Sequence, residues 1–221
     1  MSQKKQDKNQ VYLSVNQDTN ENNSEIFIVK ILLVGNPGVG KSNFIYRYIK
    51  DKFSNSNLSS VGFESNSKEI EITDKKIIVQ LWDSAGQDKY KSITKNLFTR
   101  VQGIIILYDI TNKKSFLCIQ NWIKLIKEVN NEMPYVIAGN KCDLKNAREV
   151  EEEEAIKFSR DNNIEFMETS AKLDINIVEC INNFVQNIVN SDKFTRNVSF
   201  ALQNNDNLEQ KSTINKNEKC C

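Results

Sequence analysis

The sequence predicts a single α/β domain in which a mostly parallel sheet of six strands carries helices on both faces. Short apolar runs, typical of strands buried on both sides, alternate with longer segments whose apolar residues recur at helical spacing. A glycine-rich loop at residues 35–42 joins the first such run to the first helical segment. Polar, Asn-rich ends flank this region, so we expect residues 25–190 to fold and residues 1–24 and 191–221 to be disordered extensions.

The expected elements follow one another in a regular order. A first strand at residues 26–34 leads through the glycine-rich loop into a helix that includes residues 44–49. After a polar stretch at residues 53–67, the segment KEIEIT alternates as a half-exposed strand does, and Lys75 and Lys76 after Asp74 form a predicted hairpin turn. The remaining predicted strands are 77–82, 103–109, 135–139 and 164–167, and the remaining predicted helices are 115–130, 151–160 and 175–189.

Composition excludes several classes of function. The chain has 221 residues with 30 basic and 29 acidic side chains, and this balance argues against a nucleic-acid partner. It contains no histidine, which excludes imidazole-dependent nucleophiles and the common zinc sites. The five cysteines show neither metal-binding spacing nor a dense disulfide pattern, which fits a reduced, cytosolic setting. The N-terminal residues lack the apolar core of a signal peptide, no apolar run is long enough to span a membrane, and we expect a monomer.

The loop at residues 35–42 has the pattern GxxxxGK[ST] of a phosphate-binding loop. Its glycines let consecutive backbone N–H groups turn toward one anion, Lys41 reaches the outer phosphates, and the Ser42 hydroxyl is suited to bind Mg²⁺. A glycine-rich turn with an incidental lysine is the alternative, and the order strand, loop, helix disfavours it. The expected nucleotide contacts in this region are Gly38, Val39, Gly40, Lys41, Ser42 and Asn43.

Polar residues follow two later strands. Asp83 stands where a carboxylate would hold Mg²⁺, the Gly86 N–H is expected to meet a terminal phosphate, and Gln87 is expected to orient an attacking water. By itself D-x-x-G-Q is usually only a turn.

The segment Asn140-Lys141-Cys142-Asp143 follows the run YVIAG and points to a specific base. A carboxylate at Asp143 accepts hydrogen bonds from guanine N1–H and from its exocyclic amine, whereas adenine offers no such pair of donors. After the sixth predicted strand, the backbone of Ser170, Ala171 and Lys172 is placed to cap the guanine oxygen.

The motifs GNPGVGKS, WDSAGQ, NKCD and ETSAK occur in this order within residues 26–190, and the chain resembles the Ras-superfamily small GTPases, most closely the Rab family. The resemblance implies a P-loop domain in which Lys41, Ser42 and the loop amides hold phosphate and Mg²⁺, Asp83 supports the metal, and Gln87 positions water. Phe53 matches an aromatic residue that packs against guanine. The implied base pocket comprises Asn140, Lys141, Asp143, Ala171 and Lys172.

The resemblance also implies a function. Such a protein binds GTP or GDP with Mg²⁺, hydrolyses GTP slowly until an activating protein supplies an arginine, and recruits effectors in vesicle traffic. An exchange factor and a GDP dissociation inhibitor or escort protein are the other expected partners. Two rivals stay open: an adenine-nucleotide P-loop kinase, which has no need for NKCD, and a Rab-like scaffold that binds nucleotide but hydrolyses it poorly.

Four residues depart from the family pattern. Ser60 takes the place of a threonine that ligates Mg²⁺ and meets the γ-phosphate, and Ser lacks the β-methyl group that stiffens Thr. Pro37 lacks the N–H that most relatives have in the loop. Ser65 and Leu97 replace aromatic residues, which favours an atypical set of effectors.

The chain ends in Cys220 and Cys221. The fourth residue from the end is Glu218, so there is no C-a-a-X box, and the terminal pair resembles the doubly geranylgeranylated end of Rab proteins. Two prenyl groups would anchor the protein stably on the cytoplasmic face of an intracellular membrane. The alternative is a pair of unmodified thiols.

Overall fold

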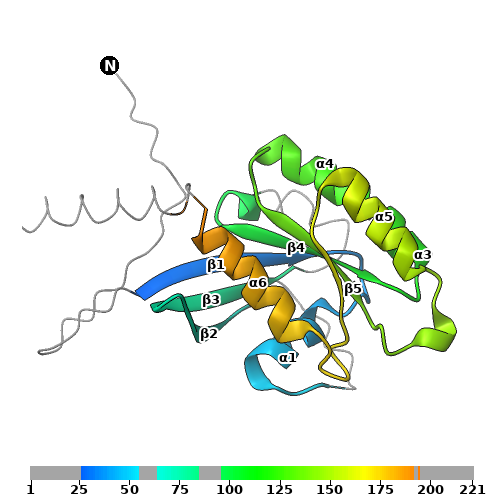
Figure 1. Cartoon of the computed structure of the whole chain (residues 1–221), viewed down its shortest axis with the longest axis horizontal. Helices are drawn as coiled ribbons and strands as arrows, with labels where there is room; N and C mark the ends of the chain where they lie inside the picture. The colour runs from blue at the N-terminus through cyan, green and yellow to red at the C-terminus, as the bar shows by residue number, and fades with distance from the viewer. Residues whose placement is uncertain (1–25, 55–63, 85–95, 192–193, 195–221) are drawn as a thin grey trace, which may run out of the picture.

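The computed structural model describes residues 26–54, 64–84, 96–191 and 194. They form a six-stranded sheet in the order β2-β3-β1-β4-β5-β6 (Figure 1), which confirms the predicted fold class. β2 pairs antiparallel with β3, and all the other pairs are parallel. The strands are β1 (Ile26–Val34), β2 (Glu64–Ile72), β3 (Lys75–Asp83), β4 (Gly103–Asp109), β5 (Tyr135–Asn140) and β6 (Phe166–Glu168).

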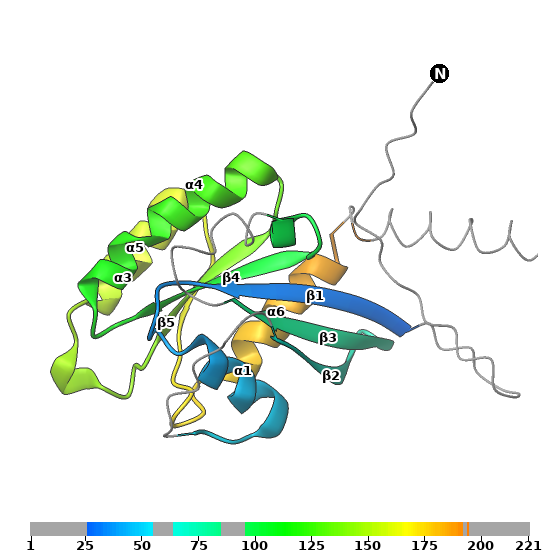
Figure 2. The same cartoon turned by 180° about the vertical axis from the view of Figure 1, so that it is seen from behind.

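Helices cover both faces of the sheet, and alternate residues of β1 pack into two different cores. Ile31 and Leu33 belong to a cluster shared with α1 and α6, and Leu32 and Val34 belong to a second cluster shared with α3, α4 and α5. α6 lies in front of the strands in Figure 1 and behind them in Figure 2, and α4 and α5 lie side by side in both views. The helices are α1 (Lys41–Lys50), α3 (Lys113–Leu117), α4 (Ile119–Val129), the short 3₁₀ helix η2 (Lys145–Ala147), α5 (Glu152–Asn162) and α6 (Ile177–Val189).

The hairpin between β2 and β3 differs from the prediction. Its turn is formed by Thr73 and Asp74, with φ of 51° and 62°, whereas Lys75 and Lys76 already belong to β3. Two consecutive residues with positive φ give a turn whose twist matches that of the strands it joins. β2 also begins at Glu64, inside the stretch predicted to be polar loop, because its mostly polar sequence ESNSKEIEI conceals the strand.

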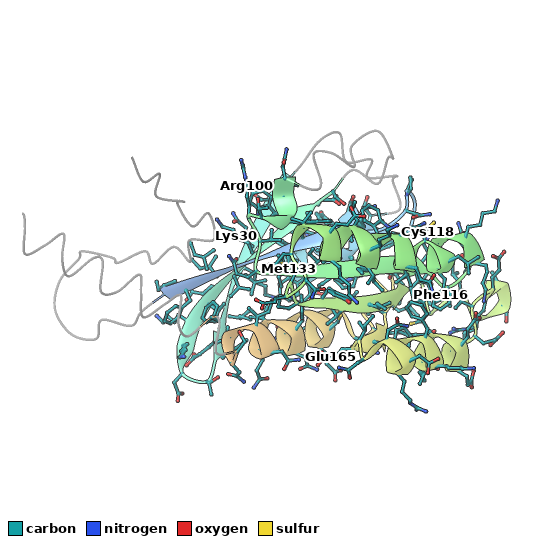
Figure 3. All side chains as sticks on the ribbon, turned by 90° about the horizontal axis from the view of Figure 1, so that it is seen from above. Lys30, Arg100, Phe116, Cys118, Met133 and Glu165 are labelled. Carbon is teal, nitrogen blue, oxygen red and sulfur yellow. The ribbon has the colours of Figure 1, made fainter. Side chains whose placement is uncertain are left out.

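The single helix predicted for residues 115–130 is in fact two helices, α3 and α4, that meet at Cys118. Phe116 and Cys118 are labelled in Figure 3. Cys118 keeps nearly helical dihedrals, with φ −73° and ψ −11°, but its carbonyl accepts from the N–H groups of both Asn121 and Trp122. This sharing tightens the first turn of α4. The break therefore depends on backbone bonding and not on a helix-breaking residue.

The folded region extends past the predicted boundary at residue 190. Phe194 is 4% exposed, and its ring meets that of Phe27 edge to face with 6.0 Å between the centroids. Its N–H donates to the Ser191 carbonyl at 3.1 Å. The prediction that the flexible tail starts at residue 191 is therefore wrong for Phe194. The sequence did not reveal this, because one aromatic residue within a polar stretch is a weak signal.

Two of the cysteines belong to the core. Cys142 and Cys180 are buried, and burial raises the pKa of the Cys180 thiol to about 12, so this thiol stays protonated at neutral pH. Cys118 is partly exposed. None of the helices that the structure describes is long and apolar enough to cross a bilayer.

Candidate nucleotide-binding site

The glycine-rich loop connects β1 to α1 at the carboxyl end of the central strand, and two of its glycines have no room for a side chain. A Cβ atom on Gly35 would lie 2.2 Å from the Leu107 carbonyl oxygen. One on Gly40 would lie 2.4 Å from Asn140 Nδ2, and Gly40 has a φ of +97°. The loop is therefore packed tightly against β4 and β5, and glycine is needed at both positions for space as well as for conformation.

Lys41 begins α1 and is almost fully buried. Its Nζ donates to the carbonyl oxygens of Gly35 and Asn36 at 3.0 and 3.1 Å. Burial lowers the pKa of Lys41 to about 8, and the nearby Asp83 carboxylate partly opposes this shift. The loop thus holds a buried ammonium group whose positive charge is only partly balanced by Asp83. A bound phosphate group would supply the missing negative charge.

Ser42 and Asp83 meet beside this lysine. The Ser42 hydroxyl donates to Asp83 Oδ2 at 2.6 Å, while the buried Asp83 Oδ1 has no hydrogen-bond partner among the described residues. An unpaired buried carboxylate oxygen next to a hydroxyl fits a hard divalent cation, and Mg²⁺ typically takes few protein ligands because phosphates and waters supply the rest. The described part of the chain has no cluster of three His, Cys, Asp or Glu residues suited to a metal.

Asn140 joins the phosphate-binding loop to the loop that carries SAK. It is 1% exposed and its Nδ2 donates to the Val39 carbonyl at 2.8 Å. Its Oδ1 accepts from the Ala171 N–H at 3.3 Å and lies 3.5 Å from the Thr169 hydroxyl. Asn140 was predicted as a nucleotide contact, and the structure shows its amide engaged on both sides within the protein.

Asp143 and Ser170 lie on the same side of the site. The fully buried Ser170 donates its hydroxyl to Asp143 Oδ1 at 2.6 Å and accepts from the Leu173 N–H at 3.1 Å. This pair orients the Asp143 carboxylate, whose second oxygen and remaining Oδ1 lone pair can accept from a ligand with two adjacent donors.

Lys141 lies across the phosphate-binding loop. It has a φ of 67°, and its Nζ is 2.6 Å from Asp109 Oδ2 and donates to the Gly38 carbonyl at 2.8 Å. Asp109 was not predicted as a site residue. A signal for it existed, because it ends the run GIIILYD at the same edge of the sheet as Asp83 and Asn140.

Some of the remaining residues named in the sequence analysis lie within the described part of the chain, and the others lie outside it. Phe53 is half-buried against the core on the α1 side, and Asn43 Oδ1 accepts from the Ser54 N–H at 3.3 Å. Ser65 lies opposite Trp82 in the β2–β3 ladder, and Leu97 is buried. Five predicted residues lie outside the described residues: Ser60, Gly86, Gln87, Cys220 and Cys221.

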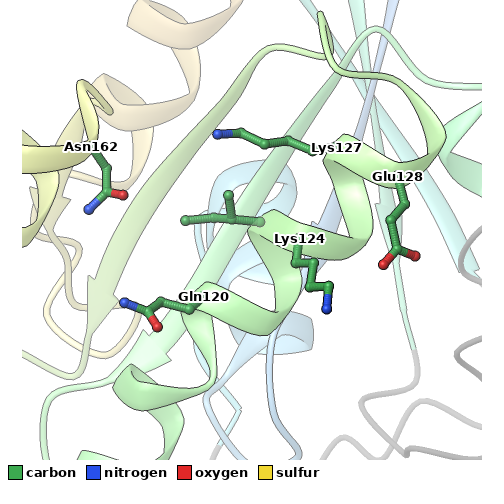
Figure 4. Close-up of a pocket in the computed structure, with 6 residues that line it drawn as sticks. Gln120, Lys124, Lys127, Glu128 and Asn162 are labelled. Carbon is green, nitrogen blue, oxygen red and sulfur yellow. The ribbon is translucent and has the colours of Figure 1, made fainter.

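A separate surface pocket of about 520 Å³ lies between α4 and the end of α5 (Figure 4). None of the predicted site residues lines it, and its lining mixes lysine, glutamate and amide side chains. The lining residues are Gln120, Ile123, Lys124, Lys127, Glu128 and Asn162.

Comparison with known proteins identifies a family for this arrangement. The sequence model of the Ras family matches residues 30–190. Ras-related protein Rab-13 from Canis lupus familiaris is 41% identical over 163 residues, which are 73% of this chain and 80% of the relative. Rab-13 from Mesocricetus auratus is 42% identical over the same length and with the same coverage. Ras-related protein Rab-8A from Bos taurus is 41% identical over 152 residues, 68% of this chain and 73% of the relative.

Proposed function

Because the chain belongs to the Ras family of small GTPases and is of the Rab type, we propose that the residues gathered at the strand ends bind GTP and GDP and operate a membrane-anchored switch. As a GTPase of this family it hydrolyses GTP to GDP and phosphate and works as a switch in membrane traffic. The Mg²⁺ site, the roles of the individual residues, the lipid anchor and the recruitment of effectors are the finer parts of the proposal.

The observation that carries the proposal is the double engagement of Asn140. Its side chain bonds Val39 in the phosphate-binding loop and Ala171 in the SAK loop, so the two loops belong to one site. The phosphate end of this site offers Lys41 and the Ser42–Asp83 pair. The other end offers the oriented Asp143 carboxylate. A ligand with polyphosphate at one end and a guanine base at the other has the chemistry of both ends.

The roles in hydrolysis follow from this placement. Lys41, Ser42 and Asp83 would hold the phosphates and Mg²⁺, which when bound neutralises charge on the phosphate oxygens. Gln87 would orient a water that attacks the γ-phosphorus, so that the bond to the β–γ bridging oxygen breaks and GDP leaves. Arg47 donates to the carbonyls of Ala171 and Lys172, and Arg148 is paired with Glu168, so both guanidinium groups are already engaged. As for other members of the family, we expect slow hydrolysis alone and acceleration on the order of 10⁵ by a partner that supplies an arginine.

Competition and single-turnover assays test the proposal. A fluorescent GDP analogue should be displaced by unlabelled GTP and not by ATP at the same concentration, because adenine lacks the paired donors for Asp143. Bound GTP should then be hydrolysed in one turnover, faster when a Rab activating protein is added. Equal displacement by ATP would support the kinase alternative, and bound but persistent GTP would support the scaffold.

The proposals about membrane anchoring and protein partners are based on the terminal residues Cys220 and Cys221 and on membership of the Rab family. We propose that Cys220 and Cys221 are both geranylgeranylated and that a GDP dissociation inhibitor or escort protein carries the modified protein between cytosol and membrane. An exchange factor and effectors complete the cycle. Mass spectrometry of the protein from its own cells tests this, since unmodified terminal cysteines would remove the anchor.

Pro37 provides a prediction about the rate of hydrolysis. It is exposed at the turn of the phosphate-binding loop and contributes no N–H. Replacing Pro37 by Gly or Ser restores one donor beside the phosphates, so we expect stimulated hydrolysis to rise by roughly tenfold while GDP affinity changes little. Single-turnover assays with and without an activating protein measure this change. If both variants hydrolyse GTP at the parent's rate, Pro37 does not influence the reaction.

A further inference from the structure

Arg47 lies outside the predicted site but contacts two of its residues directly. It lies on α1, and its Nε donates to the Ala171 carbonyl at 2.8 Å. One terminal nitrogen donates to the Lys172 carbonyl at 3.2 Å, and the other pairs with Asp51 at 3.3 Å. The Arg47 side chain is only 13% exposed, and its bond to the Ala171 carbonyl is partly buried, whereas its bond to Lys172 and its ion pair with Asp51 are exposed.

The residue that Arg47 contacts is held from two sides. The Ala171 N–H bonds Asn140 Oδ1, and the Ala171 carbonyl accepts from Arg47. Asn140 connects this loop to Val39, whereas Arg47 connects it to the helix that begins at Lys41. The SAK loop is thus fixed to the phosphate end of the site by two independent side chains.

α1 itself offers a firm support for this contact. Tyr48, the next residue, is 1% exposed, and its hydroxyl donates to Asn182 Oδ1 on α6 at 3.0 Å. Phe44 and Ile45 of the same helix are buried in the core shared with α6. Arg47 therefore transmits the position of a packed helix to the loop and does not merely cap a mobile surface segment.

We propose that Arg47 is a positioning residue that holds Ala171 and Lys172 against the guanine base and thereby sets how long GDP stays bound. The inference rests on the proposed guanine site. Arginine suits the role because its planar fork donates in two directions to two carbonyls, whereas the lysine ammonium is a point charge on a flexible stem. Release of the nucleotide would then be accompanied by loss of the Arg47 contacts.

The test compares Arg47→Met, Arg47→Lys and the control Asp51→Asn. Methionine keeps most of the apolar stem but donates no hydrogen bond, so we expect GDP to dissociate about tenfold faster. Lysine should give an intermediate rate. Asp51→Asn removes the exposed ion pair, keeps both carbonyl contacts, and suits the left-handed φ of 52° at this position, so its rate should match the parent. Displacement of a fluorescent GDP analogue by excess GDP gives all four rates.

A second readout separates positioning of the base loop from general destabilisation. Arg47→Met should weaken GDP binding about tenfold while ADP, measured by competition at millimolar concentration, changes less than twofold, because ADP depends on the phosphate end alone. Single-turnover hydrolysis of bound GTP should keep its rate constant. The inference is overturned if GDP dissociates at the parental rate from Arg47→Met, or if GDP and ADP weaken equally. If the parent protein itself does not bind GDP, the proposed function fails before this inference is reached.

Discussion

Gly40→Ala is expected to weaken GDP binding at least 1,000-fold. The new Cβ atom would lie 2.4 Å from Asn140 Nδ2, far inside van der Waals contact, at a backbone φ of +97° that alanine rarely adopts. Relief of the clash requires Asn140 to move, and Asn140 holds both the Val39 carbonyl and the Ala171 N–H. One methyl group would thus disturb the phosphate end and the base end together.

The control for this prediction is Gly38→Ala in the same loop. Gly38 also has a positive φ, +80°, but a Cβ atom there would meet nothing within 4 Å. Its cost is the backbone strain alone, roughly 1–2 kcal/mol or about tenfold in affinity. Titration calorimetry gives both affinities, and circular dichroism establishes that both variants fold. If the two variants bind GDP with similar affinity, the clash with Asn140 is not the reason that glycine is needed at position 40.

Asp143→Asn is expected to weaken GDP binding by roughly 100-fold to 1,000-fold and to change the preferred base. The aspartate offers only acceptors, which match the N1–H and amine of guanine, and an asparagine places an NH₂ donor opposite one of those donors. Xanthine carries a carbonyl oxygen where guanine has the amine, so xanthosine diphosphate should bind the variant more tightly than GDP does.

The Asp143 variant is expected to keep its fold, since the Ser170 hydroxyl that donates to Asp143 Oδ1 can also bond an amide oxygen. Competition between GDP and xanthosine diphosphate for a fluorescent analogue measures the preference. Asp161→Asn, a change of the same kind on the exposed surface of α5, should leave both affinities unaltered. A variant that still prefers GDP would show that Asp143 does not read the base.

The elements predicted best are those whose own residues carry the signal. β1 and β4 were predicted at their observed bounds, Ile26–Val34 and Gly103–Asp109, because a strand buried on both faces is an uninterrupted apolar run between polar neighbours. The elements predicted worst lack that signal. The Thr73–Asp74 turn belongs to a polar run that continues through Lys75 and Lys76, and the break at Cys118 lies inside an uninterrupted helical pattern.

The residues of the candidate site also differ in how well the sequence predicts them. Lys41, Ser42, Asp83 and Asp143 could be found in the sequence because each lies in a short motif whose spacing reflects a local turn. Asp109 and Arg47 could not be assigned a role in this way. Asp109 matters through an ion pair with Lys141, and Arg47 through carbonyls that are 124 and 125 residues away along the chain.

The sequence by itself therefore determined the fold class, the family and the chemical groups that the site can offer, because periodicity and motif spacing depend on residues close together in the chain. Only the tertiary structure decided which of these groups touch. The parallel order of β3, β1, β4 and β5 brings the ends of four strands to one edge, where Asn140 links Val39 to Ala171 across 101 and 31 residues of chain. Such contacts depend on strand order, on register and on the packing of α1 against α6, and these arise when distant segments bury their apolar faces together.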